Sequence, residues 1–213
     1  MSTNRNAAVA LMIGSIAGLV TMAFHPTGHD VMRNASAGAP NTLNVAMHFL
    51  ALAAQPLLLA GTLALTSRFR ARRDIAVVAY IFFAVATVAV MIAAVASGFL
   101  APSLVRGYAE ADEPTRTVMI NALTYTGRVN QAFATVYVAF SALAILLWSV
   151  AALPGGDLPR SLARYGIPLG ALLILGILSG YLQLDIHGFG LVVLGEGVWM
   201  VSAAVVLWRS NDG

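Results

Sequence analysis

Long apolar runs alternate with short polar segments along the whole chain. A helix needs about 20 apolar residues to cross a hydrocarbon layer of roughly 30 Å, and open loops are not tolerated against lipid. The ten-residue alternation of a membrane β-barrel is absent from the sequence. We therefore predict an all-α integral membrane protein with one domain, residues 1–213, that forms a six-transmembrane-helix bundle in the lipid bilayer. The predicted spans are residues 7–24, 44–65, 75–101, 129–153, 167–184 and 188–208.

The composition agrees with a membrane protein and excludes several other classes. The chain of 213 residues is 59% hydrophobic and only 10% charged, whereas about a quarter of the residues of a soluble domain are charged. All twelve basic residues are arginines in short segments between apolar runs, which does not indicate nucleic-acid binding. The chain has no cysteine, so disulfides, thiolate metal sites and iron–sulfur clusters are excluded.

The arginines also predict the orientation. Eight of them fall on one side of the predicted bundle and four on the other. By the positive-inside rule, this bias places both termini in the cytoplasm of a cell with an inner membrane. Residues 35–37 could suit a signal-peptide cleavage site, but they lie too far beyond the first apolar run, so we interpret that run as a membrane helix.

Two segments on the outer side, residues 26–43 and 102–128, are longer than the other connections. The second contains Asp112, Glu113 and Pro114, which are typical of a helix start. We expect a short helix there that lies on the membrane surface.

All four histidines fall on the predicted outer side, together with three carboxylates. His25 and His29 follow the first span, and His48 lies about one turn into the second. Imidazole and carboxylate groups bind zinc, copper, iron or manganese. The sequence therefore predicts a transition-metal site with candidate ligands His25, His29, Asp30, His48, Asp185, His187 and Glu196.

Other interpretations of the histidines remain open. His48 and His187 belong to different segments and could be the axial ligands of a haem. His25 and His29 could instead be solvated loop residues, and Asp185 could be solvated or could orient His187.

Glu196 is the one ionisable residue inside the last apolar run, where we expect it roughly 8 Å below the outer surface. Ionisable groups in a membrane span are costly and indicate function. Gly195 and Gly197 flank it and allow other helices to approach. Glu196 could carry a proton, act as a general base for a metal-bound water, or be a protonated structural partner of His48 or Arg128.

Helical spacing predicts which faces turn inward. Two segments carry a stripe of the same spacing along one helical face. The first consists of Gly14, Gly18, Thr21 and His25, and the second of Gly176, Gly180, Gln183 and His187. This likeness indicates a parallel internal repeat. Glycine faces also suit a homo-oligomer or a larger membrane complex.

Two further stripes contain polar residues, and we expect them to line a pocket that opens to the outside. In the second span the stripe is His48, Leu52, Gln55 and Leu59, and in the fourth it is Asn130, Ala134, Tyr137 and Ser141.

Three functions follow from these observations. The first is an outward-facing pocket of histidines and carboxylates that binds a metal ion or metal cofactor for redox, hydrolytic or metal-handling work. The second is a proton-coupled secondary transporter that uses Glu196, with a helix broken at Pro56. The third is a non-catalytic membrane subunit that packs against partner proteins.

Overall fold

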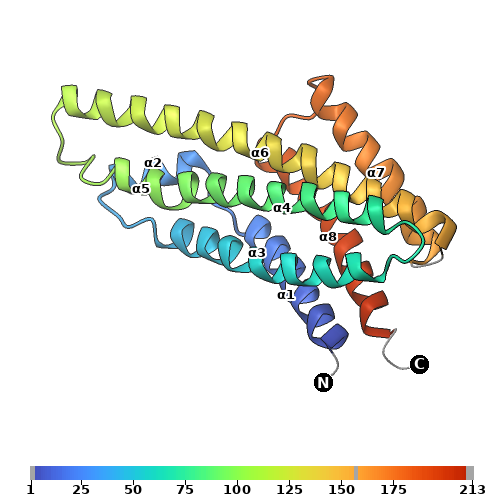
Figure 1. Ribbon diagram of the computed structural model, residues 1–213. Coiled ribbons are helices and arrows are strands. Elements are labelled where there is room, and N and C mark those ends of the chain that lie inside the picture. The colour runs from blue at the N-terminus through green and yellow to red at the C-terminus, as the bar shows by residue number, and fades with distance from the viewer. Residues whose placement is uncertain (1–2, 156–157, 210–213) are drawn as a thin grey trace.

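The computed structural model describes residues 3–155 and 158–209, and the regular elements of these residues are all helices (Figure 1). Six helices are long and apolar enough to cross a membrane, as the sequence predicts. Four of them are α1 (Thr3–Ala23), α3 (Thr42–Arg68), α7 (Arg160–Leu178) and α8 (Ile186–Arg209). The other two are α6 (Glu113–Gly155) and α4 (Arg73–Val95), which continues through the π-helix η1 (Ala96–Leu100) into α5 (Ala101–Leu104). The short helix α2 (Gly28–Ser36) follows α1.

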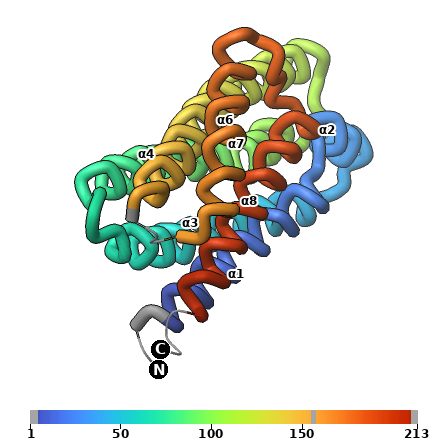
Figure 2. The backbone as a smooth tube through the Cα atoms, turned by 90° about the vertical axis from the view of Figure 1, so that its right-hand side faces the viewer, coloured from blue at the N-terminus to red at the C-terminus, as the bar shows by residue number. Residues whose placement is uncertain are grey.

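The long helices pack in a closed ring that follows the order of the chain. α1 contacts α3, α3 contacts α4, α4 contacts α6 and α6 contacts α7, while α8 contacts both α7 and α1. Figures 1 and 2 show α3, α4 and α6 side by side, crossed by the pair α1 and α8. The beginning of α1 and the end of α8 lie together, where the guanidinium carbon of Arg5 is 4.6 Å from the ring centroid of Trp208.

Glycines bring α1 and α3 into close contact. A Cβ atom at Gly61 of α3 would lie 2.5 Å from the Cβ of Leu11, and a Cβ at Gly14 of α1 would lie 2.9 Å from Cγ of Leu58. Only glycine allows backbones to approach this closely. Gly14 and Gly61 are therefore buried in the contact between α1 and α3 of the same chain.

The half of the bundle in which α1 begins and α8 ends has a packed apolar core. Trp148 of α6 and Trp199 of α8 are fully buried there, with stacked rings whose centroids are 5.8 Å apart. The indole N–H of Trp148 donates a hydrogen bond of 3.1 Å to the hydroxyl of Thr66. Side chains from all six long helices form this core, and the cavities around the histidines and Glu196 lie toward the other end of the bundle.

The expected short surface helix after residue 112 is wrong in its extent. α6 begins at Glu113, close to the predicted start, but it runs without a break through the fourth span. Its 43 residues correspond to about 65 Å, roughly twice the thickness of the hydrocarbon layer. Its first turns therefore project beyond a membrane around the bundle or cross it at a steep tilt.

The expected end of the fifth span and the internal repeat are also wrong. α7 ends at Leu178 rather than at residue 184, because Gly180 adopts a left-handed conformation with φ of 74°. The N–H of Leu182 then bonds to the carbonyl of Gly176 over 2.9 Å, which closes the helix end. Gly176 and His187 thus do not share one helical face, and the likeness to the glycine stripe of α1 is confined to the sequence.

Candidate functional site

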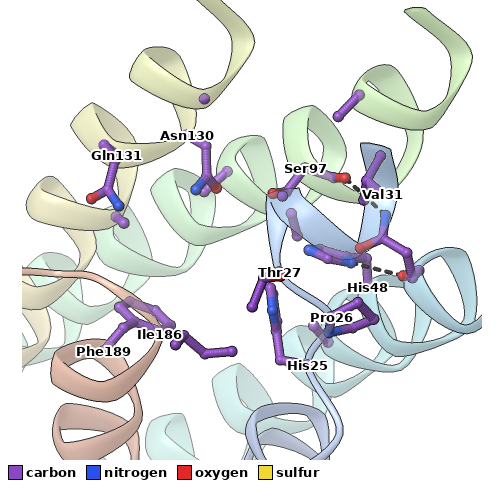
Figure 3. A pocket seen from close by; sticks show the side chains of 18 of the residues that line it. His25, Pro26, Thr27, Val31, His48, Ser97, Asn130, Gln131, Ile186 and Phe189 are labelled. Carbon is purple, nitrogen blue, oxygen red and sulfur yellow. Dashed lines mark hydrogen bonds between the residues drawn. The ribbon is translucent and has the colours of Figure 1, made fainter. Parts of the chain in front are cut away.

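A cavity of about 360 Å³ opens between α1, α3, α6, η1 and the start of α8. We call it the outer pocket, and Figure 3 shows most of the side chains that line it. Its lining contains apolar groups together with two imidazoles, several amides and hydroxyls, and one carboxylate. The polar residues that line the outer pocket are Thr21, His25, Thr27, Asn44, His48, Ser97, Thr126, Asn130, Gln131 and Asp185.

His48 is held in one orientation at the wall of the outer pocket. Its side chain is only 3% exposed, and its Nδ1 lies 2.8 Å from the backbone carbonyl oxygen of Asn44. A carbonyl can only accept, so Nδ1 carries the proton of the neutral ring. The lone pair of His48 is therefore on Nε2.

The π-helix η1 forms the wall next to His48. The side-chain amide of Asn44 donates to the carbonyl oxygens of Ser97 and Gly98, over 2.9 and 3.3 Å. Asn44 thus binds backbone groups of η1 with its amide and His48 with its own carbonyl. Single π-turns inside α-helices are frequent at functional sites, and here the π-turn places Ser97 at the outer pocket.

His25 lies beside His48, in the segment that connects α1 to α2. The two ring centroids are 4.7 Å apart and the rings meet edge to face (Figure 3). The Nδ1 of His25 is buried and has no hydrogen-bond partner in the part of the chain that the structure describes. Burial lowers the pKa of His25 below its ordinary value, so the ring is neutral at neutral pH. His25 is thus half-buried against His48 and is not a fully solvated loop residue, whereas His29 is exposed.

Asp30 has a local structural role. The hydroxyl of Thr27 accepts a 3.1 Å hydrogen bond from the N–H of Asp30, and the carboxylate of Asp30 accepts one of 2.9 Å from the N–H of Thr27. This reciprocal pair is a capping box, which starts α2. Asp30 also pairs with Arg33 over 2.8 Å. The hydrogen bond from the backbone N–H of Thr27 is the main cause that lowers the pKa of Asp30 below its ordinary value.

The connection between α7 and α8 closes another side of the outer pocket. Asp185 accepts a 2.8 Å hydrogen bond from the N–H of Gly188 and so caps the start of α8. The side-chain amide of Gln131 donates to the carbonyl of Leu184 over 2.8 Å, which ties this connection to α6. His187 is exposed and does not line the outer pocket.

Glu196 is buried within α8 and has other partners than expected. α8 begins at Ile186, so Glu196 lies about 15 Å along the helix axis from its start. Its side chain is 3% exposed. Tyr137 donates to one carboxyl oxygen over 2.8 Å, and the hydroxyl of Ser141 lies 2.6 Å from the other. Neither His48 nor Arg128, the expected partners, bonds to Glu196 in the described residues.

Glu196 faces a second cavity of about 90 Å³, which we call the inner cavity. Tyr137 is the other titratable side chain among the described residues that line it. The inner cavity and the outer pocket have five lining residues in common, so the two cavities adjoin each other. The shared residues are Thr21, Met22, Ala51, Val90 and Phe189.

The structure thus distributes the seven candidate ligands over several places. His25, His48 and Asp185 line the outer pocket, Glu196 faces the inner cavity, and the rest lie outside both. Within residues 3–155 and 158–209, no group of three or more histidine, cysteine or carboxylate side chains is close enough to hold a metal ion. The histidine pair and the glutamate with its hydroxyls are the two chemical features that the fold assembles.

Comparison with protein-family models, with curated protein sequences and with solved structures finds no match to this chain. The inference of function therefore depends on the geometry of the two cavities.

Proposed function

We propose that the protein is a proton-coupled secondary transporter of an inner membrane, with both termini in the cytoplasm. In this proposal the outer pocket receives the solute from the outer side and Glu196 binds the coupling proton. The observation that carries the proposal is the contact of Glu196 with two hydroxyl groups in a cavity next to the outer pocket.

Counting hydrogens supports a reversible proton site. The hydroxyl of Ser141 has one proton and lies within hydrogen-bond distance of both Glu196 and the carbonyl of Tyr137, at 2.6 and 2.8 Å. If Ser141 donates to Glu196, the carboxylate is ionised and accepts from two hydroxyls. If Ser141 donates to the carbonyl, Glu196 must be the donor and is protonated. Both states fit the same positions of the heavy atoms.

The arrangement of cavities supports access from one side. The inner cavity adjoins the outer pocket, whereas the tryptophan-rich core occupies the other half of the bundle, where a hollow of about 350 Å³ between α1 and α8 is lined by apolar residues. A carrier open to one side has this distribution of space, and ionisable residues in membrane helices commonly mark proton pathways. The cluster of arginines between α3 and α4 supports the cytoplasmic assignment of the closed side.

The proposal is tested by proton flux into liposomes that contain a pH-sensitive dye. Purified protein is reconstituted, the external buffer is acidified, and a potassium potential with valinomycin makes the interior negative. We expect the wild type to acidify the interior faster than empty liposomes and Glu196→Gln to match empty liposomes.

Glu113→Gln is the matched control, because Glu113 is an exposed carboxylate at the start of α6. It should behave as the wild type. Equal acidification by wild type, Glu196→Gln and empty liposomes would contradict the proposal.

A resident metal cofactor in the outer pocket is the second candidate function, and the neighbouring imidazoles of His25 and His48 favour it. It predicts a near-stoichiometric metal in protein purified from metal-replete cells, lost in His48→Ala. The geometry gives no support to a haem bound by His48 and His187, because His187 is exposed and lies outside the outer pocket that His48 lines. A non-catalytic subunit predicts that neither His48→Ala nor Glu196→Gln changes any activity, and that a larger complex co-purifies.

A further inference from the structure

We infer that the outer pocket binds a soft metal cation, monovalent copper, between His25 and His48, and that this ion is the cargo. The part of this inference that concerns transport rests on the proposed function above. The binding site itself rests on the geometry of the two imidazoles and on the chemistry of the side chains around them.

Each imidazole at the pocket has a nitrogen that can bind a metal ion. The Nδ1 of His48 is engaged by the carbonyl of Asn44, so its lone pair is on Nε2. Metal-binding histidines commonly donate their second nitrogen to a carbonyl in this way, which fixes the ring. The Nδ1 of His25 has no partner in the described part of the chain, although it is buried. Burying a polar atom without a partner is unfavourable, so a ligand that binds this nitrogen would relieve the cost.

The two rings are close enough to bind one ion. A nitrogen–metal bond is about 2 Å long, so the centroids of two imidazoles on one ion lie at most about 6 Å apart. The observed separation is 4.7 Å, and the rings are tilted by 66° rather than stacked. Figure 3 shows both side chains at the same wall of the pocket. Because His48 is fixed by its hydrogen bond to Asn44, binding of a shared ion requires the ring of His25 to turn its free nitrogen toward Nε2 of His48.

The charge of the lining selects a cation. Asp185 is the charged side chain among the described residues that line the outer pocket, and no arginine reaches it. An anion would therefore meet no compensating charge. One carboxyl oxygen of Asp185 is already engaged by the N–H of Gly188, so the pocket does not offer the oxygen cage that magnesium, calcium or manganese prefers.

The donor set selects a soft ion. Besides the two imidazoles, the thioether of Met22 belongs to a residue that lines the pocket, three positions before His25 in the chain. Thioether and imidazole donors suit monovalent copper, whereas a closed zinc site has four protein ligands. Few, neutral donors also suit a cargo, because the ion must leave the site again.

The test is an equilibrium competition between detergent-purified protein and the chelator bicinchoninate for monovalent copper in the presence of ascorbate. We expect the wild type to bind one ion per chain. His25→Ala and His48→Ala should each weaken binding roughly tenfold or more, as is usual for changes at a metal site. His29→Ala is the matched control, because His29 is exposed and lies outside the pocket, and it should bind as the wild type.

Monodispersity and melting temperature are measured for each variant to show that it is folded. If His48→Ala does not fold, His25→Ala still tests the site, because His25 lies in a connection outside the helices.

The inference is overturned if the wild type binds no better than the two pocket variants, or if His29→Ala weakens binding equally. Because this assay uses no membrane, copper binding without proton flux would refute only the transport proposal. Proton flux without copper binding would refute only this inference.

Discussion

Gly98 of η1 lies directly against His48 of α3, so closely that a side-chain carbon at position 98 would overlap the Cβ of His48. The π-turn, the glycine within it and the histidine beside it therefore form one packed unit. The orientation of His48 depends on this unit as well as on its hydrogen bond to Asn44.

Gly98→Ala should displace His48 and destabilise the contact between α3 and η1. Overpacking a tight contact typically costs about 1–3 kcal/mol, so a lower melting temperature is expected together with weaker ligand binding in the outer pocket. Thermal unfolding in detergent and the copper competition assay measure the two effects. Gly18→Ala is the control, because a Cβ at Gly18 meets no other atom within 4 Å. If both variants behave as the wild type, the packed unit has no role.

Asn44→Ala should change the backbone of η1. The substitution removes the donor to the carbonyls of Ser97 and Gly98, and an unsatisfied buried group costs about 1–3 kcal/mol. We expect faster amide hydrogen exchange in residues 96–104 than in the wild type. Unchanged exchange there would mean that the π-turn persists without Asn44. The Gln131→Ala variant, which removes an amide from the opposite wall, should leave exchange in η1 unaltered.

Removing the hydroxyls around Glu196 should separate its two protonation states. Tyr137→Phe and Ser141→Ala each remove one donor to the ionised carboxylate. A hydrogen bond to a charged group contributes about 1.5–3 kcal/mol, so the ionised form should become less populated and proton flux should fall without being abolished. Thr135→Ala is the control, since its hydroxyl bonds only to the carbonyl of Gln131 among the described contacts. Flux equal to the wild type in both variants would contradict the proton site.

Cysteine accessibility tests the orientation. The chain has no cysteine, so single cysteines can be introduced into an otherwise unreactive background. Tyr181 is 91% exposed in the connection between α7 and α8, and Arg70 is exposed between α3 and α4. We expect a membrane-impermeant thiol reagent added to whole spheroplasts to label Tyr181→Cys and not Arg70→Cys. The reverse labelling pattern would place the termini outside.

The capping box of α2 provides a prediction for pH dependence. The pKa of Asp30 is lowered in the folded protein, so its contribution to the stability of α2 is complete above the ordinary value of 3.8 and is lost as the pH falls through the lowered pKa. Asp30→Asn should therefore show faster amide exchange in α2 than the wild type at neutral pH, and the difference should shrink in acid. A difference that does not change with pH would contradict this role.

The long helices could be predicted from the sequence because lipid requires uncharged apolar runs of a minimum length. The residues at which the helices begin and end could not all be predicted in this way. Residues 179–184 are apolar enough to extend a span, and only the left-handed conformation at Gly180 ends α7 before them. Likewise, hydropathy alone does not distinguish a separate surface helix from the first turns of α6, because both are amphipathic outside the lipid.

The candidate site could be predicted only in part. Helical spacing correctly placed Tyr137 and Ser141 on the inward face of α6, but their contact with Glu196 depends on how α6 and α8 are positioned across the ring. The approach of His25 to His48 could not be read from spacing either, because Pro26 ends α1 and the connection to α2 folds back. The π-turn had no recognisable sequence signal besides Gly98.

The most direct test of the proton site is an infrared difference spectrum of the reconstituted protein as the buffer pH is changed. A protonated carboxylic acid has a carbonyl band that an ionised one lacks. The band of Glu196 is identified by its absence in Glu196→Gln. Glu110→Gln is the control, because Glu110 is exposed. The account predicts a band that is absent in Glu196→Gln, present in Glu110→Gln, and reversibly lost as the pH rises while the protein stays folded. A Glu196 band of constant intensity at every such pH would show a permanently protonated structural residue and would contradict proton coupling at this site.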